Sequence, residues 1–216
     1  MKELRICYPR ERNLIMDLHK KFSGNLFIDV GAGEGQYCIN LADKFKEVWA
    51  VEPFTRHWVT LNKNIRELKI CNIKTFKVAV GDKVGKLNLY GDNVILLSHG
   101  SPSAKKTLRC TLINETLHFD KVLETVEETT LATLLCDRRA DLVKVDVEGY
   151  ELEVLKGAEP VINQIDAWQI ELHDWAEKAE IKNFLETHGY RVVEKSAEYI
   201  YDRVSEGGWF LALKGE

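Results

Sequence analysis

The stretch of sequence that decides the fold is residues 28–35, which read Ile28-Asp29-Val30-Gly31-Ala32-Gly33-Glu34-Gly35. An apolar run with an Asp before its last residue is followed by three glycines at alternate positions, and a stretch with helical periodicity comes next. Glycines at such positions supply unusual backbone angles and let a ligand approach the main chain without a Cβ atom in the way. The pattern predicts the strand–turn–helix unit of an α/β fold, with a nucleoside ligand bound against the glycine turn.

The spacing of the glycines indicates which nucleoside cofactor is bound. The dinucleotide fingerprint G-x-G-x-x-G seats a pyrophosphate at a helix N-terminus. This chain has the tighter G-x-G-x-G, which we associate with S-adenosylmethionine (SAM), a cofactor without phosphate groups. Glu52, at the end of the next apolar run, supports SAM, because an ionised carboxylate can accept hydrogen bonds from both ribose hydroxyls. The same spacing disfavours an NAD-type dehydrogenase or epimerase.

Length and composition fit one globular domain, residues 1–216. Hydrophobic residues make up 45% of the chain and charged residues 30%, which argues against disorder. The net charge of −4 gives no broad electrostatic footprint for nucleic acid. The five cysteines are widely spaced, as expected of reduced thiols, and neither a signal peptide nor a membrane-spanning run is visible. We therefore expect a cytoplasmic protein.

Hydrophobic periodicity predicts alternating helices and strands. An amphipathic helix is predicted first, over about residues 10–22. Predicted strands follow at residues 26–30, 48–51, 73–80, 141–147, 167–172, 190–194 and 209–213. Further helical stretches are predicted at about residues 38–45, 58–68, 131–135, 152–158 and 181–188. This order predicts an α/β fold with a doubly wound, mostly parallel sheet and helices on both faces.

The regular alternation stops between about residues 83 and 129. This stretch contains alternating apolar and polar pieces and a polar middle rich in Ser, Gly and Pro. A long irregular segment inside a compact domain is more often functional than structural. We therefore expect an irregular, β-rich insertion that forms a lid or a wall of the substrate site.

A second diagnostic stretch, residues 141–158, reads D-L-V-K-V-D-V-E-G-Y-E-L-E-V-L-K-G-A. Side chains alternate along a strand, so Lys144, Asp146 and Glu148 are predicted to project to one side of an otherwise apolar run. Charges in a buried parallel strand are costly unless they are used or paired. Ligands of open α/β sheets bind beyond the carboxyl ends of the strands, where Asp146 and Glu148 fall. Ion pairing between Lys144 and a carboxylate is the structural alternative for part of this pattern.

This stretch resembles the signature D-x-x-K-x-D-x-E-G-x-E-x-x-x-L-x-G-A of the FkbM family of SAM-dependent methyltransferases. The resemblance extends to residues 27–35, 51–53, 78–82 and 170–173, whereas residues 92–129 and the first twenty residues follow no family pattern. It implies a seven-stranded class I methyltransferase (Rossmann-like) sheet, with six parallel strands and one antiparallel strand near an edge. It also implies methyl transfer, usually to an oxygen of a sugar or another small metabolite.

The resemblance further implies which residues bind the cofactor. From the transferred methyl to the adenine, these are Asp146 beside the methyl, Asp29, Gly31 and Gly33 along the methionine end of SAM, Glu52 at the ribose, Phe54 or a neighbour on the adenine ring, and Asp82 at the adenine amino group. The resemblance therefore implies the fold and the cofactor of this chain, but it does not imply the identity of the methyl acceptor.

Methyl transfer to a hydroxyl needs a group that accepts the hydroxyl proton, and such a base contributes about 10²–10⁴-fold in rate. The candidates by location are Asp146, Glu148, Glu171 and His173. The ordinary pKa of histidine suits this role at neutral pH, although a surface histidine is an equally good interpretation of His173. Glu148, Glu171 and His173 have ligand types that suit a divalent ion, but they lack tight spacing, and no metal is predicted.

Two other functions remain as alternatives. Base-methylating enzymes often carry an N/D-P-P-[YF] loop after the central strand, where this chain has residues 146–149 as D-V-E-G. Together with the acidic balance, this argues against RNA methylation and against a nucleic-acid partner. A non-catalytic SAM-binding protein is disfavoured by the near-complete set of motifs. We predict an O-methyltransferase that acts on a small-molecule or glycan-linked hydroxyl, with no membrane partner and with its oligomeric state undetermined.

Overall fold

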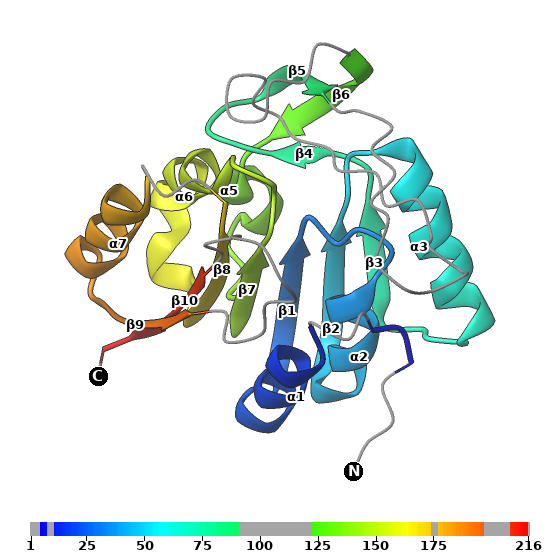
Figure 1. The fold of residues 1–216 in the computed structure, drawn as a ribbon, viewed down its shortest axis with the longest axis horizontal. Coiled ribbons are helices and arrows are strands. Elements are labelled where there is room, and N and C mark those ends of the chain that lie inside the picture. Colours follow the sequence, from blue (N-terminus) through cyan, green and yellow to red (C-terminus); the bar gives the residue numbers. More distant parts are fainter. Residues whose placement is uncertain (1–4, 8–10, 91–121, 174–176, 197–207, 216) are drawn as a thin grey trace, which may run out of the picture.

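The computed structural model describes residues 5–7, 11–90, 122–173, 177–196 and 208–215. A seven-stranded sheet in the order β3-β2-β1-β7-β8-β10-β9 forms its centre (Figure 1). The strands are β1 (Gly24–Val30), β2 (Phe45–Val51), β3 (Ile73–Phe76), β7 (Leu142–Val145), β8 (Ala167–Leu172), β9 (Tyr190–Ser196) and β10 (Gly208–Lys214). β10 is antiparallel to both of its neighbours, and the other pairs are parallel. The doubly wound sheet with one reversed strand near an edge is therefore confirmed.

The central strands are apolar on both faces, as expected for a parallel sheet covered by helices on each side. Because successive strand side chains point to opposite faces, β1 divides its residues between two cores. Leu26 and Ile28 belong to one core and Phe27 to the other, and all three side chains are fully buried.

The helices divide between the two faces (Figure 1). α1 (Arg12–Lys21), α2 (Gln36–Leu41) and α3 (Thr55–Glu67) pack on the face of Phe27. α5 (Leu131–Leu135), α6 (Glu151–Ala158) and α7 (Lys178–Thr187) pack on the opposite face. α5 begins after Thr130, whose Oγ1 accepts a hydrogen bond from the backbone N–H of Thr133 at 3.0 Å, the usual N-cap interaction.

The prediction of one strand over residues 73–80 is wrong. β3 ends at Phe76, and Ala79–Val80 forms β4 in a separate three-stranded sheet of order β4-β6-β5. β5 (Gly85–Tyr90) and β6 (Val122–Thr129) are antiparallel and lie within the expected insertion. Residues 91–121, the rest of that insertion, lie outside the described residues. The hydrophobic pattern of an apolar run is the same whether the chain stays in one sheet or crosses to another. The periodicity therefore could not predict the break between β3 and β4.

Two predicted boundaries also need correction. The helix expected to reach residue 45 ends at Leu41, is followed by a 3₁₀ turn over Ala42–Lys44, and gives way to β2 at Phe45. The strand expected over residues 141–147 ends at Val145, so Asp146 and Glu148 lie in the loop after it. In both cases the apolar pattern continues through the boundary, because the flanking residues pack on the same cores. A second 3₁₀ turn, Glu159–Gln164, follows α6.

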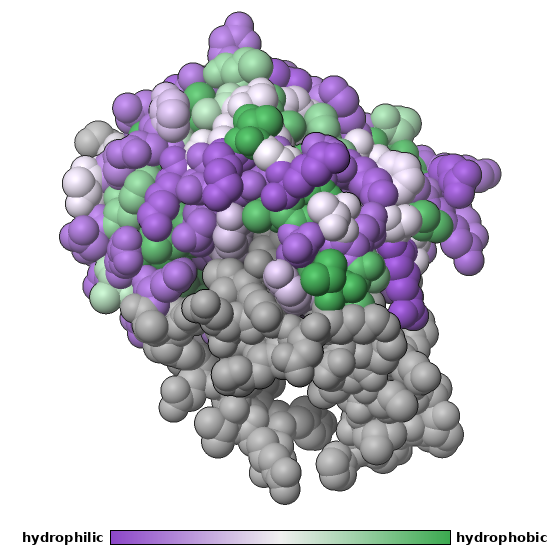
Figure 2. Space-filling view, turned by 90° about the horizontal axis from the view of Figure 1, so that it is seen from above, coloured by the Kyte–Doolittle hydropathy of each residue, from purple (hydrophilic) through white to green (hydrophobic). Residues whose placement is uncertain are grey.

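Hydrophilic residues predominate over the described part of one face of the molecule (Figure 2). Viewed from above Figure 1, the side to which the carboxyl end of β1 points, apolar residues form separate patches among polar ones (Figure 2). The large apolar side chains exposed among the described residues are Val59 on α3, Val84 just before β5 and Val122 at the start of β6, so they form no common patch by sequence position. Within the described ranges, no helix is both long and apolar enough to cross a membrane.

Candidate active site

A pocket opens at the carboxyl ends of β1, β2 and β7, the edge where open α/β sheets bind ligands. The turn after β1 contributes Gly31 and Gly33, the turn after β2 contributes Glu52, and the loop after β7 contributes Asp146 and Glu148. The two fingerprint stretches, far apart in the sequence, therefore line one pocket.

Gly31 lies where two loops cross at close range. Its backbone N–H donates to the carbonyl of Val51 at 3.0 Å, and the N–H of Asp146 donates to the carbonyl of Val30 at 3.0 Å. A Cβ atom added to Gly31 would lie 1.8 Å from the carbonyl oxygen of Asp146, and its φ of +79° favours glycine. Glycine at this position lets the two halves of the pocket come together.

Glu52 is buried at the floor of the pocket, with 5% of its surface exposed. Its carboxylate accepts backbone N–H bonds from Gly33 at 2.8 Å and from Phe54 at 2.9 Å, one on each oxygen. A carboxylate has about four acceptor positions, so two remain for hydroxyl donors. Burial raises the pKa of Glu52 to about 7, against the lowering effect of the two N–H donors.

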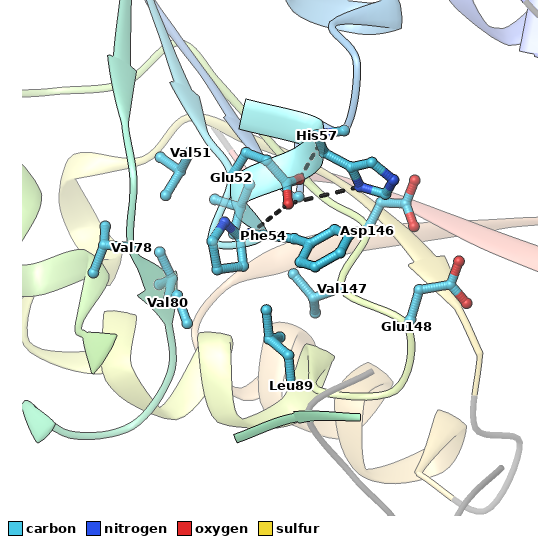
Figure 3. A pocket seen from close by; sticks show the side chains of 15 residues that line it. Val51, Glu52, Phe54, His57, Val78, Val80, Leu89, Asp146, Val147 and Glu148 are labelled. Carbon is cyan, nitrogen blue, oxygen red and sulfur yellow. Dashed lines mark hydrogen bonds and ion pairs between the residues drawn. The ribbon is translucent and has the colours of Figure 1, made fainter. Parts of the chain in front are cut away.

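Space for a ligand lies beside Gly33. An added Cβ at Gly33 would meet no atom within 4 Å, although this residue lines the pocket. Figure 3 shows Val78 and Val80 on the side of the pocket opposite the carboxylates of Asp146 and Glu148. The pocket therefore has an apolar wall facing an acidic one, which suits a ligand with an apolar ring at one end and a cation at the other.

His57 is a pocket residue that the sequence analysis missed. Its Nδ1 lies 3.8 Å from Oε1 of Glu52, and its ring meets the ring of Phe54 edge-on, with centroids 5.2 Å apart. Burial lowers the pKa of His57, so the ring is neutral at neutral pH. No local signal marked this residue, because it follows the Glu52 turn on the first turn of an ordinary amphipathic helix, α3.

Lys144 is a buried cation that lies between the carboxylates of Asp146 and Asp29. The side chain is 1% exposed, and its Nζ lies 3.0 Å from Oδ2 of Asp146 and 3.7 Å from Oδ1 of Asp29. Burial alone would lower the pKa of Lys144, but these carboxylates raise it, so the residue stays charged. Asp29 also accepts the N–H of Cys38, at the start of α2, and is fully buried. It lies behind the pocket and is not among the residues that line it.

His173, at the end of β8, lies among four carboxylates. Its Nδ1 is 2.9 Å from Oε1 of Glu151. Its Nε2 is 3.6 Å from an oxygen of Glu148, 3.7 Å from one of Asp146 and 3.8 Å from one of Glu171. The structure therefore brings together all four residues named as candidate bases. It adds Glu151, which belongs to the quoted signature but had been given no role.

The charges in this group shift its proton affinities. Burial lowers the pKa of His173, but the hydrogen bond to Glu151 and the charges of Asp146 and Glu148 outweigh burial and raise it to about 10. The Asp146 carboxylate, and then burial, raise the pKa of Glu171. A histidine already protonated at neutral pH cannot accept a proton, so the site favours the carboxylates over His173 as the base.

Glu148 and Asp82, two further residues predicted to belong to the site, differ in where the structure places them. Glu148 has a φ of +55°, a left-handed conformation that is costly for a residue with a side chain and that occurs often at functional sites. Asp82 lies at the surface, 39% exposed, with its carboxylate 3.7 Å from Nζ of Lys83, and it is not among the pocket-lining residues.

The reversed strand β10 near one edge, the glycine turn and the pocket at the strand ends together define a class I methyltransferase fold. The methyltransferase FkbM domain model matches residues 29–192. The chain therefore belongs to the FkbM family of methyltransferases, enzymes that take their methyl group from SAM. No curated protein matches the chain.

Solved structures share the fold at low sequence identity. Methyltransferase FkbM from Methylobacillus flagellatus KT is 18% identical with a TM-score of 0.60, and the match covers 88% of this chain but only 44% of that protein. An rRNA methylase from Streptococcus thermophilus is 9% identical, with a TM-score of 0.57 and coverage of 97% and 98%. TrmK from M. capricolum, in complex with the cofactor product S-adenosyl-homocysteine, is 14% identical, with a TM-score of 0.53 and coverage of 93% and 67%. At these identities the likeness concerns the fold alone.

Proposed function

We propose that this chain transfers a methyl group from SAM to a hydroxyl oxygen of a sugar or another small metabolite. The observation that carries the proposal is the junction of two sites: the Glu52 pocket and the acidic group around His173 share Asp146 and Glu148. A nucleoside site and a set of proton acceptors thus meet at one edge of the sheet.

The pocket residues fit SAM. Gly33 borders open space, and Glu52 keeps two acceptor positions for the ribose hydroxyls. Val78 and Val80 offer an apolar surface for the adenine. The acidic wall at Asp146 attracts a cation, and SAM supplies a methyl group on a positively charged sulfur. Asp29, Phe54 and Asp82 stay proposed contacts by family resemblance, Asp29 from behind the pocket and Asp82 only after its side chain turns inward.

Methyl transfer is an in-line displacement, so the main task of the protein is to hold the acceptor oxygen in line with the methyl. Such positioning can supply about 7–11 kcal/mol of barrier reduction. Glu148 lines the pocket and lies next to Asp146 (Figure 3), which makes it the carboxylate best placed to accept the hydroxyl proton. Glu171 is the second candidate, because it lies at the end of the adjacent strand.

The acidic character of the site favours a neutral hydroxyl acceptor over RNA. Four carboxylates lie within 3.8 Å of His173, with Lys144 as the nearby buried cation. A polyanion would be repelled at this edge, whereas a sugar hydroxyl would meet hydrogen-bond acceptors.

The test has two stages. Calorimetry should show micromolar binding of SAM and no binding of NAD; tighter binding of NAD than of SAM would refute the cofactor assignment. Transfer of labelled methyl from SAM is then measured to pools of sugars, other hydroxylated metabolites and RNA. We expect label in a hydroxylated small molecule. Label in RNA alone, or none despite tight SAM binding, would refute the acceptor class.

A further inference from the structure

Asp146, Glu171 and His173 surround a common point at the carboxyl ends of β7 and β8. Each offers one ligand atom, and these three atoms lie within 4.8 Å of one another. The Nε2 of His173 is 3.7 Å from Oδ1 of Asp146 and 3.8 Å from Oε1 of Glu171, too far for hydrogen bonds. Ligand atoms that share one ion at about 2.1 Å lie about 3–4 Å apart, so these separations fit a bound metal.

Contact with the carboxylate of Glu151 fixes the orientation of the His173 ring. Its Nδ1 lies 2.9 Å from Oε1 of Glu151, a side chain that is 1% exposed and that also accepts the N–H of Gly149 at 3.1 Å. A metal-binding histidine characteristically donates its other ring N–H to a carboxylate, which sets the tautomer and turns the free nitrogen toward the ion. The Glu151–His173 pair has this arrangement, and Nε2 lies within 3.8 Å of carboxylate oxygens of Asp146, Glu148 and Glu171.

The local charge balance also calls for a cation. The second oxygen of Glu151, Oε2, is buried and has no hydrogen-bond partner among the described residues. Among the described residues, four carboxylates lie within 3.8 Å of the His173 ring, those of Asp146, Glu148, Glu151 and Glu171, and Lys144 pairs with one of them. Carboxylates gathered this closely repel one another, and a divalent ion among them would relieve that repulsion as it displaces the proton from Nε2 of His173.

We propose that Asp146, Glu171 and His173 bind one divalent metal ion beside the cofactor pocket, and that this ion binds the hydroxyl of the methyl acceptor. Two carboxylate oxygens and one imidazole nitrogen form a mixed donor set that suits first-row divalent ions, of which Mn²⁺ is a convenient probe, whereas Ca²⁺ prefers oxygen ligands alone. The inference rests on the proposed function for the identity of the acceptor, but the metal site itself can be tested separately.

The ion would act on the acceptor as a Lewis acid. Binding lowers the pKa of a hydroxyl, whose proton then passes to a carboxylate such as Glu148. An oxygen lone pair forms the new C–O bond while the C–S bond breaks, and the electron pair of that bond stays on the sulfur. An acceptor with two neighbouring oxygens, such as a vicinal diol, would bind the ion most firmly.

The full chain, treated with EDTA and dialysed, is titrated with Mn²⁺ while the EPR signal of the free ion is followed. We expect one saturable site, at least tenfold weaker in Glu171→Gln and in His173→Gln. Glu124→Gln is the matched control, because Glu124 has similar side-chain exposure (24% against 27% for Glu171) but pairs with Lys77 and Thr55, which are not part of the cluster. It should bind Mn²⁺ like the wild type.

Thermal unfolding gives a second measurement that does not depend on activity. Mn²⁺ should raise the Tm of the wild type and of Glu124→Gln, and should raise the Tm of the two cluster variants less at the same Mn²⁺ concentration. Absence of saturable Mn²⁺ binding by the wild type, or equal binding by folded cluster variants, would overturn the metal site. SAM binding in EDTA and methyl transfer to the acceptor pools are measured separately, so lost SAM binding or label in RNA alone would refute the proposed function without bearing on Mn²⁺ binding.

Discussion

Replacement of Glu52 by Gln tests the cofactor pocket most directly. In the structure, each carboxylate oxygen of Glu52 accepts one backbone N–H, from Gly33 and from Phe54. Gln has one acceptor oxygen, and its NH₂ group would face an N–H donor at the other position. One charge-assisted bond to the ribose is then lost, which costs about 1.5–3 kcal/mol, or about a tenfold to 150-fold increase in the Kd for SAM.

The assay is calorimetric titration of SAM, with Glu47→Gln as the control. Glu47 lies on the same strand, β2, but pairs with Arg138 at 2.8 Å outside the pocket. The Tm of Glu52→Gln should not fall appreciably, because removal of a costly buried charge offsets the weakened backbone bond. An unchanged Kd in a folded Glu52→Gln protein would refute the assignment of the ribose site.

The pH dependence of SAM binding follows from the same carboxyl. Burial raises the pKa of Glu52 to about 7, so the group gains a proton, and loses acceptor capacity, as the pH falls through 7. SAM affinity should therefore weaken between pH 8 and pH 6 in the wild type, and this dependence should be reduced in Glu52→Gln. The sign for stability is opposite, since a raised carboxyl pKa makes the folded state more stable as the pH falls from about 7 toward 4.5. If SAM affinity depended on pH identically in the wild type and in Glu52→Gln, the dependence would come from a group other than Glu52.

The remaining predictions concern the loops that meet at the pocket. Gly31→Ala should destabilise the fold by several kcal/mol in denaturant unfolding, because its Cβ would lie 1.8 Å from the carbonyl of Asp146; a loss below about 1 kcal/mol would contradict the observed crossing. Lys144→Met should cost about 3–5 kcal/mol by the same measurement, since it leaves buried carboxylates without their cation, and a neutral effect would mean that they are protonated. Glu148→Gln should leave the Kd for SAM unchanged and lower kcat and kcat/KM alike by about 10²–10⁴-fold, whereas wild-type turnover would move the search for the base to Glu171.

Much of the fold could be predicted from the sequence, because its signals are local. Strand 167–172 and helix 131–135 match the structure residue for residue, since each is an apolar segment with clear ends. The glycine turn and Glu52 were found because backbone geometry and an acidic strand end leave a mark within a few residues. The split of residues 73–80 between two sheets left no such mark, because both segments bury apolar side chains.

The sequence alone predicted the class of enzyme, its cofactor and the edge of the sheet where we propose that the chemistry takes place. Only the tertiary structure decided which charged groups meet there. The pairing of β7 with β8 brings Asp146 to His173, and the packing of α6 places Glu151 behind the imidazole. His57 joined the pocket in the same way, through the packing of α3 beside the Glu52 turn. Spacing along the chain describes one strand or helix at a time, whereas proton affinities and ligand sets depend on neighbours contributed by different elements.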